Sequence, residues 1–313
     1  MSIFTHTNEK EGKIGIGKLP ADLHPILKDI SDEYNDIIPD KNLSTYHTWY
    51  DELPPSIKDK LNKIKSHNFW TKLCVGKKCV RIAVNEMDEL YYSNFKKTSN
   101  TISNSISKNL YGATGNIVIH KDCHEVCSFN TISLYRILIG LTNDNTNIIT
   151  KFNNFNAETK INSGDYAIFD FSRTTHQVIK ENQDIQTPRI LLKLHFMICE
   201  DCEYSKPYLQ FLKSYFIAYD NITRYILKTG TDPKTFYQFF IGLLTQFFYL
   251  DYVYYIIVFI IIFIIVFLRF IFNIKLIYKN RYKLITYIIG SLLFCYLFIV
   301  FIYWIRYRVT GIK

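Results

Sequence analysis

Two long uncharged apolar runs near the C-terminal end constrain this chain more than any other feature. The first is YVYYIIVFIIIFIIVFL at residues 252–268, and the second is LITYIIGSLLFCYLFIVFIYWI at residues 284–305. A helix needs about 20 apolar residues to cross a bilayer, and in lipid its backbone must be satisfied within the segment. Neither run has a polar face, and Tyr and Trp gather near the ends. We therefore expect a two-helix membrane hairpin within residues 251–313, with two buried soluble helices as the alternative.

The positive charge of the chain is concentrated around these runs. Eight of the 37 Lys and Arg residues lie between Tyr252 and Lys313, where there is no Asp or Glu, so residues 1–251 carry 29 basic against 28 acidic side chains. This distribution is typical of membrane anchoring and not of a nucleic-acid groove. We predict a membrane protein that binds no nucleic acid.

The side of the membrane on which the remaining chain lies has two interpretations. The first residues lack the apolar core of a signal peptide, which favours an integral membrane protein with two C-terminal spans and its N-terminal part in the cytosol. The loop KLIYKNRYK at residues 275–283 carries four basic residues, and positive loops prefer the cytosol, which favours the lumenal side for the N-terminal part instead. We expect the cytosolic arrangement, with the lumenal one as the alternative. The sequence indicates no oligomeric state.

The chain before the apolar runs divides into three parts. Residues 1–65 contain helical patterns and form a predicted helical arm, residues 66–204 are rich in β-type runs, and residues 205–250 form an amphipathic helical connector. The predicted strands are 72–75, 79–84, 116–120, 132–141, 147–152, 166–171, 176–180 and 189–198. Many short strands at steady spacing predict a mainly β fold with helices, a sandwich or jelly roll whose sheet is covered by the N-terminal helices.

Six of the seven cysteines form close pairs in the sequence. The pairs are Cys74/Cys79, Cys123/Cys127 and Cys199/Cys202, and Cys295 lies inside the second apolar run. Disulfides would imply a cysteine-rich lumenal module. The C-x-x-C pair could instead bind zinc or be redox-active, and all six could be reduced cytosolic thiols.

The stretch NIVIHKDCHEVC at residues 116–127 runs from a strand pattern into metal-ligand side chains. On an extended segment, His120 and Asp122 point to the same face. Non-haem Fe(II) oxygenases hold iron with two His and one carboxylate, so a second His would have to come from a distant strand. An H-x-D pair alone is a weak signal, because a chain with eight His contains one by chance quite often.

A later stretch, INSGDYAIFDFSRTTHQVIKENQDIQTPRILLKLHF, supplies that His. It contains a Gly-Asp turn, a strand, His176 and a further strand that begins near Arg189. With His120, Asp122, His176 and Arg189 in this order, residues 110–198 resemble the 2-oxoglutarate/Fe(II)-dependent dioxygenase family, in prolyl-hydroxylase-like or aspartyl/asparaginyl β-hydroxylase-like form.

The resemblance implies a double-stranded β-helix core and a set of site residues. His120, Asp122 and His176 would be the catalytic iron ligands, and Arg189 would bind the far carboxylate of 2-oxoglutarate. Lys193 shares the face of Arg189 by alternation and is the second choice for that carboxylate. The implied cofactors are Fe(2+), 2-oxoglutarate and O2, with ascorbate as an optional reductant.

The two subfamilies differ in what they imply for this chain. In aspartyl/asparaginyl β-hydroxylases the strand that matches YRILIGL carries an Arg that contacts 2-oxoglutarate, which points to Arg136, but that group typically lacks the Asp of H-x-D. Prolyl-hydroxylase-like members keep the Asp but usually carry Lys where this chain has Arg189. We interpret His124 as a loop or supporting residue and leave Cys123 and Cys127 structural.

These patterns lead to one function hypothesis and one alternative. The chain is predicted to be a membrane-anchored dioxygenase that hydroxylates a protein side chain or a lipid near the membrane. The alternative is a catalytically silent jelly-roll domain that binds or scaffolds a partner and is tethered to the membrane by its tail.

Overall fold

The computed structural model describes residues 3–8, 10–39, 41, 45–94, 117–123, 127, 129, 131–143, 145, 147–182, 188–231 and 235–237. Described residues up to Asp220 belong to one compact unit, and those from Asn221 onward belong to another. Within the described residues, no helix has both the length and the apolarity needed to cross a bilayer. The runs at 252–268 and 284–305, and with them the predicted hairpin, lie outside the described residues.

Two antiparallel sheets form the core of the first unit. The large sheet has the order β1 (His6–Asn8), β2 (Gly12–Lys18), β10 (Asp165–Asp170), β7 (Ile132–Gly140), β12 (Arg189–Cys199), β5 (Glu89–Ser93) and β3 (Thr45–Trp49), and β4 (Val80–Ala83) also pairs with β12. The small sheet has the order β6 (Ile117–His120), β11 (His176–Lys180), β8 (Ile148–Phe152) and β9 (Ala157–Thr159). The mainly β core with helices is thus confirmed, and its two sheets have a jelly-roll-like arrangement.

The alternation of side chains along β12 shows how the layers pack. Its even-numbered residues, Ile190 to Ile198, join the apolar core that also contains the buried faces of the helices α1 (His24–Ile37) and α2 (Pro55–Ser66). Leu191 faces the other way and joins a core that contains Phe152 of the small sheet. One face of the large sheet is therefore covered by helices and the other by the small sheet.

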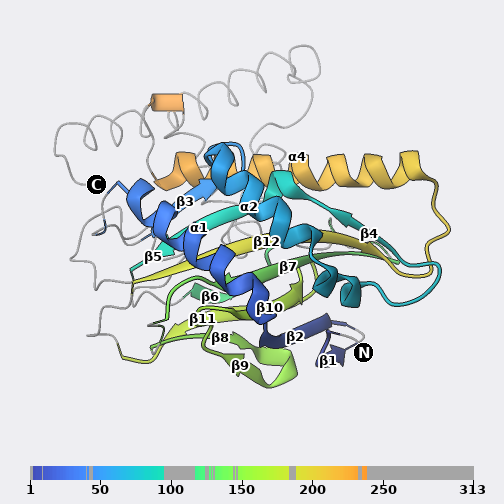
Figure 1. Cartoon of the computed structure of the whole chain (residues 1–313). Coiled ribbons are helices and arrows are strands. Elements are labelled where there is room, and N and C mark those ends of the chain that lie inside the picture. The colour runs from blue at the N-terminus through green and yellow to red at the C-terminus, as the bar shows by residue number, and fades with distance from the viewer. Residues whose placement is uncertain are drawn as a thin grey trace, which may run out of the picture. The chain divides into compact units, whose positions relative to one another are not determined.

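The N-terminal helices cover the large sheet because each presents one apolar face. Proline stands in the first turn of both α1 and α2, where its missing N–H costs nothing. On α1 the residues Leu27, Ile30 and Tyr34 follow the three-and-four spacing and are buried. Figure 1 shows both helices lying across the sheet. The helix α4 (Lys206–Thr231) buries Leu209, Leu212 and Phe216 in a separate apolar cluster with β7 and β12 residues.

Seven of the eight predicted strand runs are confirmed, at 79–84 and at the six later positions. The run at 72–75 was wrong: Leu73 ends the 3-10 helix η2 (Asn68–Leu73), and Cys74 closes a disulfide-bonded loop. The predicted helical arm also contributes β1, β2 and β3 to the large sheet, which the sequence analysis missed. Short strands such as β3 offer too few residues for alternation to be detected.

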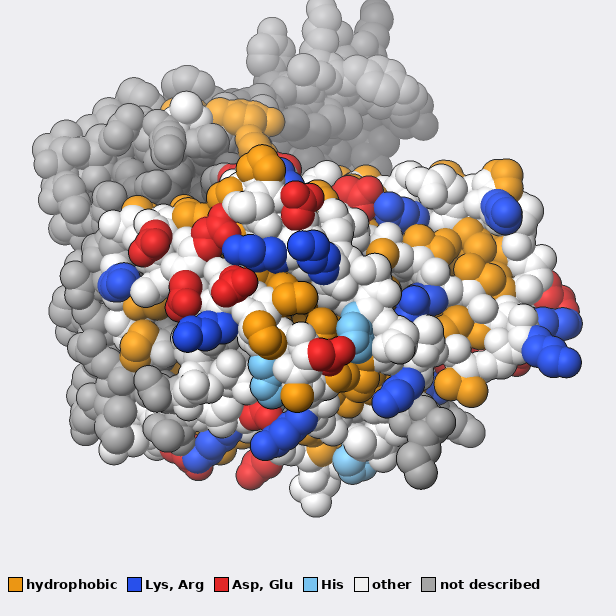
Figure 2. Space-filling model, viewed as in Figure 1, with side chains coloured by type: hydrophobic (Ala, Val, Ile, Leu, Met, Phe, Trp, Pro, Cys, Tyr) orange, Lys and Arg blue, Asp and Glu red, His pale blue; other side chains and the backbone are white. Residues whose placement is uncertain are grey.

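The surface of the described part mixes charges of both signs. On the face shown in Figure 2, acidic and basic side chains lie next to one another between scattered apolar ones. This mixture matches the near-neutral balance of residues 1–251.

Candidate functional site

The three predicted iron ligands lie on two adjacent strand ends of the small sheet. His120 is the last residue of β6 and His176 is the first of β11, and their Cα positions are direct partners across the antiparallel pair. Asp122 follows β6 after one residue. The side chain of His120 lies outside the described part of the structure. The backbone therefore brings all three positions to one edge of the sheet.

Asp122 and His176 approach each other with their ligand atoms. The Oδ2 atom of Asp122 lies 3.7 Å from Nε2 of His176. The other ring nitrogen of His176, Nδ1, lies 3.3 Å from the carbonyl oxygen of Thr174. Because a carbonyl can only accept, Nδ1 donates to Thr174, and the Nε2 edge of the ring faces Asp122. Metal-bound histidines are commonly oriented by such a bond to a backbone carbonyl.

This donor set fits a divalent ion. Bonds of about 2.1 Å to a carboxylate oxygen and an imidazole nitrogen place adjacent ligand atoms roughly 3 Å apart. Asp122 Oδ2 and His176 Nε2, at 3.7 Å, would therefore approach each other by about 0.7 Å to share an ion. Among the side chains that the structure describes, no group of three potential ligands is assembled. The third predicted ligand, His120, is not among those side chains. The residues present thus form two-thirds of the predicted set in a suitable arrangement.

The ring of His176 is fixed by aromatic neighbours from both sheets. Its centroid lies 4.5 Å from the ring of Phe169 on β10 and 6.4 Å from that of Phe152 on β8. The side chain is only 7% exposed. The imidazole therefore has one dry face and turns its Nε2 edge toward Asp122.

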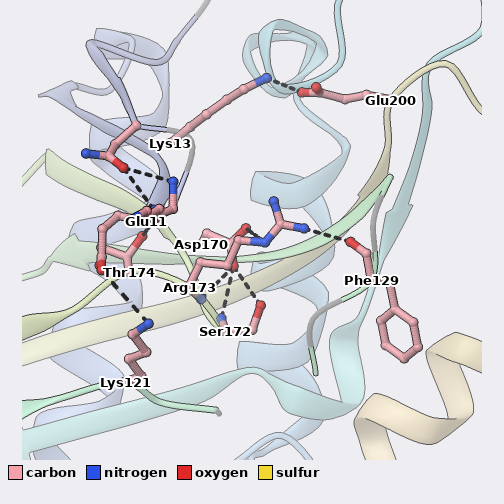
Figure 3. Close-up of polar contacts among 11 residues, drawn as sticks. Glu11, Lys13, Lys121, Phe129, Asp170, Ser172, Arg173, Thr174 and Glu200 are labelled. Atoms are coloured by element: carbon pink, nitrogen blue, oxygen red, sulfur yellow. Dashed lines mark hydrogen bonds and ion pairs between the residues drawn. The ribbon is translucent and has the colours of Figure 1, made fainter. Parts of the chain in front are cut away.

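A tight turn between β10 and β11 sets the position of His176. Oδ1 of the fully buried Asp170 accepts bonds from the backbone N–H of Ser172 at 3.0 Å, the Ser172 hydroxyl at 2.8 Å and the backbone N–H of Arg173 at 3.0 Å. The Arg173 guanidinium donates to the carbonyl of Phe129 at 2.7 Å. Figure 3 shows these bonds converging on Asp170. This turn is capped by the Asp170 side chain, which fixes the backbone conformation just before His176.

Glu11, from the bend between β1 and β2, contacts both ligand-bearing segments. Its Oε2 accepts the backbone N–H of Thr175 at 2.7 Å, and its carbonyl accepts the hydroxyl of Thr174 at 2.8 Å. Its Oε1 lies 3.9 Å from Nζ of Lys121, the residue between His120 and Asp122 (Figure 3).

Gly12 permits the close approach of this bend. It has a φ of 78°, and a Cβ at this position would lie 2.9 Å from the Cβ of Asp170.

The sequence analysis missed Glu11 and Asp170. The Asp-x-Ser pattern before Thr-Thr-His was the available signal for the capped turn.

Arg136, predicted as one contact of 2-oxoglutarate, lies beside Asp122. Its Nη1 is 2.8 Å from Oδ1 of Asp122, and its Nε donates to Nε2 of His195 at 3.0 Å. The guanidinium lies over the Phe171 ring, 4.6 Å from the centroid. Arg136 thus holds Asp122 through Oδ1, and Oδ2 of Asp122 faces His176.

Arg189 and Lys193, the other predicted 2-oxoglutarate contacts, lie along the inner face of β12. Arg189 is 1% exposed, and its Nε donates to the Ser93 hydroxyl at 3.1 Å. Burial lowers the pKa of Arg189 to about 10, so the guanidinium remains charged near neutral pH. Lys193 forms an ion pair with Glu89 and lies over the Tyr91 ring, 4.5 Å from its centroid.

Glu89 is an interior carboxylate that the sequence gave no reason to expect. It is 6% exposed and contacts both Lys193 and Nδ1 of His47, the latter at 3.3 Å. Burial alone would raise the pKa of Glu89, but the charges of Lys193 and His47 outweigh it and hold this pKa well below its usual range. Lys193 is therefore already neutralised by a carboxylate of the chain itself.

The six paired cysteines form three disulfides, Cys74–Cys79, Cys123–Cys127 and Cys199–Cys202. Of the three interpretations left open by the sequence, the structure has the first. Cys123 and Cys127 are fully buried, and the backbone N–H of Cys123 donates to the carbonyl of Phe171 at 3.1 Å. This disulfide closes the chain directly after Asp122. Cys295 and His124 lie outside the described residues.

Comparison with known proteins gives no family by sequence. No family model matches the chain, and no curated protein matches it. Among solved structures, the chain is similar to the viral collagen prolyl hydroxylase vCPH from Paramecium Bursaria Chlorella virus-1 in its 2OG complex, at 15% identity and a TM-score of 0.35, with 61% of this chain and 99% of that chain covered.

Two further structures give comparable values. For a Pseudomonas putida prolyl-4-hydroxylase the identity is 10% and the TM-score 0.34, covering 58% and 91% of the two chains. For HygX from Streptomyces hygroscopicus with nickel and 2-oxoglutarate bound, the identity is 8% and the TM-score 0.37, covering 60% and 82%. TM-scores this low support no conclusion about function, so the proposed function rests on the geometry of the site.

Proposed function

We propose that the chain is an Fe(II)/2-oxoglutarate-dependent dioxygenase that hydroxylates a protein side chain or a lipid. The observation that supports it best is the meeting of Asp122 and His176, which are far apart in the sequence, at 3.7 Å beside the backbone position of His120. His120, Asp122 and His176 would hold the iron. Held there together with 2-oxoglutarate and O2, the iron would supply the oxidising chemistry for hydroxylation of a substrate C–H bond, with succinate and CO2 as co-products.

The residues of the chain have separate tasks in this proposal. The bond from His176 Nδ1 to Thr174 orients the ring so that Nε2 faces Asp122. Arg136 pairs with Asp122 and orients it through Oδ1. Arg189 offers a buried, charged guanidinium on the inner face of β12, where it would take the far carboxylate of 2-oxoglutarate in a bidentate contact.

The experiment that tests the proposal measures succinate released from 2-oxoglutarate by the full-length chain with Fe(II) and O2. His176→Ala removes one of three ligands, and we expect succinate release to fall to the background level. His6→Ala, on the exposed β1, is the matched control and should keep the activity of the unchanged chain. If the unchanged chain bound no Fe(II) under anaerobic, reducing conditions, the proposal would be wrong.

One observation favours the second candidate, a binding or scaffold domain without catalysis. Arg136 already neutralises Asp122, and Glu89 already neutralises Lys193, so both interior pairs are stable without metal or 2-oxoglutarate. This candidate predicts no metal-dependent consumption of 2-oxoglutarate, whereas the dioxygenase predicts it. Calorimetric titration with 2-oxoglutarate in the presence and absence of Fe(II) separates the two.

We also propose that the domain faces an oxidising compartment beside the membrane, which is the lumenal alternative. The support is the set of three disulfides, because such bonds persist outside the reducing cytosol. The apolar runs at 252–268 and 284–305 would anchor it. Thiol-reactive mass tagging of the protein in intact cells should label none of the six paired cysteines, and labelling of all six would exclude this placement. Turnover against lipid and peptide pools would then separate the two substrate classes.

A further inference from the structure

We propose that Lys65, Asp88, His195 and Arg136 form a buried polar chain whose function is to position the carboxylate of Asp122 for metal binding. This inference rests on the proposed function, and it makes Arg136 a positioning residue for a ligand instead of a contact of 2-oxoglutarate.

The contacts run without a break from beneath the helices to the candidate metal site. Nζ of Lys65 on α2 lies 2.7 Å from Oδ2 of Asp88, which stands between η3 (Asn85–Met87) and β5. Oδ1 of Asp88 accepts the backbone N–H of His195 at 2.9 Å and lies 3.5 Å from its Nδ1. Arg136 then bridges Nε2 of His195 at 3.0 Å and Oδ1 of Asp122 at 2.8 Å.

The donors and acceptors along this chain fix the tautomer of His195. A guanidinium has only donors, so Nε2 of His195 must accept from Arg136 and carries no proton. The ring proton then lies on Nδ1, which is the nitrogen turned toward Asp88. His195 is therefore neutral and passes the orientation of Asp88 to Arg136. The planar fork of Arg136 is fixed at two points and by the Phe171 ring below it.

Burial separates this chain from an ordinary surface ion pair. The side chains of Asp88 and His195 are fully buried, and that of Lys65 is 3% exposed. Burying charges is costly, and an apolar cluster of the same volume is often as stable, so a buried ionic chain is weak support for a purely stabilising role. Its outer end is Asp122, whose Oδ2 faces His176. The buried contacts that begin at Lys65 thus fix Arg136, and Arg136 in turn fixes the direction in which Oδ2 of Asp122 points.

The experiment measures anaerobic binding of Co(II) to the full-length chain, by titration of the visible absorption bands that the ligands impose. His195→Leu removes the acceptor for Arg136 and the Nδ1 contact with Asp88 at similar volume, and we expect Co(II) binding about 10–100-fold weaker and an altered spectrum. His195→Gln keeps an acceptor for Arg136 and a donor for Asp88, and it should restore binding to within a few-fold. Leu194→Ala is the matched control, because Leu194 lies on the same strand but faces the helices. It should lower the melting temperature without changing Co(II) affinity.

A second variant keeps the test decisive if His195→Leu does not fold. Arg136→Lys retains a cation near Asp122 but cannot hold His195 and Asp122 together, so we expect about 10-fold weaker Co(II) binding in a folded protein. If Arg136→Lys, and His195→Leu where it folds, bind Co(II) with unchanged affinity and spectrum, the inference is overturned while the proposed function stands. If the unchanged chain binds no Co(II), the proposed function and this inference fall together.

Discussion

The two sheets hold their halves of the candidate site by different physical means. Asp122 is held through Arg136 of the large sheet, behind which lie buried charges drawn from distant parts of the chain. His176 begins a strand of the small sheet and is held by a local turn, by backbone bonds to Asp170 and Glu11 and by aromatic rings. Asp122 therefore depends on buried ion pairs, whereas His176 depends mainly on hydrogen bonds to the backbone that precedes it. Substitutions in the two supports should therefore differ in how much they change the free energy of unfolding, and in how that change depends on salt and pH.

The largest effect is expected at the inner end of the polar chain. Asp88→Asn removes the charge that compensates Lys65, while Lys65 stays buried. Breaking a buried pair costs about 3–5 kcal/mol, and we expect the free energy of unfolding to fall by that amount in a denaturant titration of the detergent-solubilised full-length chain. Glu86→Gln is the control, since Glu86 pairs with Lys213 at 3.0 Å but is 46% exposed, and should cost about 0–1 kcal/mol. Equal losses in the two variants would show that the buried Lys65–Asp88 pair contributes no more than an exposed ion pair.

This polar chain also marks the limit of what the sequence could predict. Strand alternation and motif order singled out His120, Asp122 and His176 in the sequence, and the structure brings His176 beside the backbone of His120 and the side chain of Asp122. Their role as iron ligands stays a prediction. Alternation along β12 puts His195 on the same face as Arg189 and Lys193. It could not show that Arg136 would be its cross-strand partner, because register between β7 and β12 depends on the whole sheet.

The difference between local sequence signals and pairing that depends on the whole sheet also explains which strands could be predicted. β10 and β12 are long apolar runs, and burial on both faces makes them evident in the sequence. β2 is rich in glycine, and its partner β10 lies far along the chain, so only the completed sheet makes it a strand. Glu89 on β5 was hidden for a similar reason, since its buried charge makes sense only beside Lys193.

A slightly smaller effect, with a distinctive pH dependence, is expected for the interior pair Glu89–Lys193. The pKa of Glu89 is lowered in the folded state, so between that pKa and the unfolded value of about 4.3 only the unfolded chain binds the proton. Glu89 therefore stabilises the fold above about pH 4.3, and this contribution is lost as the pH falls through the folded pKa. Glu89→Gln should cost about 3 kcal/mol at pH 7 and progressively less below about pH 4, measured by denaturant titrations across pH.

The double variant Glu89→Gln/Lys193→Met is the control for this pair. It removes both charges and should recover most of the stability lost by Glu89→Gln at pH 7, because no buried charge is left uncompensated. A double variant less stable than the single one would show that the pair acts through packing and not through charge.

On the side of the small sheet, a moderate effect is expected at the turn before His176. Asp170→Ala removes the acceptor of three bonds at Oδ1, and we expect a loss of about 2 kcal/mol. Asp170→Asn keeps an oxygen acceptor and should lose about half as much. Because these bonds are short-range, 0.5 M salt should leave both losses unchanged, whereas it should reduce any contribution from exposed ion pairs. A strong salt dependence of the Asp170→Ala loss would contradict the short-range account.

The smallest effect is expected where the two kinds of support meet, at Glu11. Glu11→Gln keeps an oxygen for the backbone N–H of Thr175 but loses the charge that faces Lys121 at 3.9 Å. Since Lys121 is one-third exposed, the lost attraction is worth less than about 0.5 kcal/mol. Glu11→Ala loses the hydrogen bond as well and should cost about 1 kcal/mol. The two variants are compared by their melting temperatures at low and high salt, with Lys121→Gln as the matched control. If Glu11→Gln and Lys121→Gln each destabilise as much as Glu11→Ala, then charge, and not the backbone bond, holds the His176 segment, and the contrast between the two ligand supports is lost.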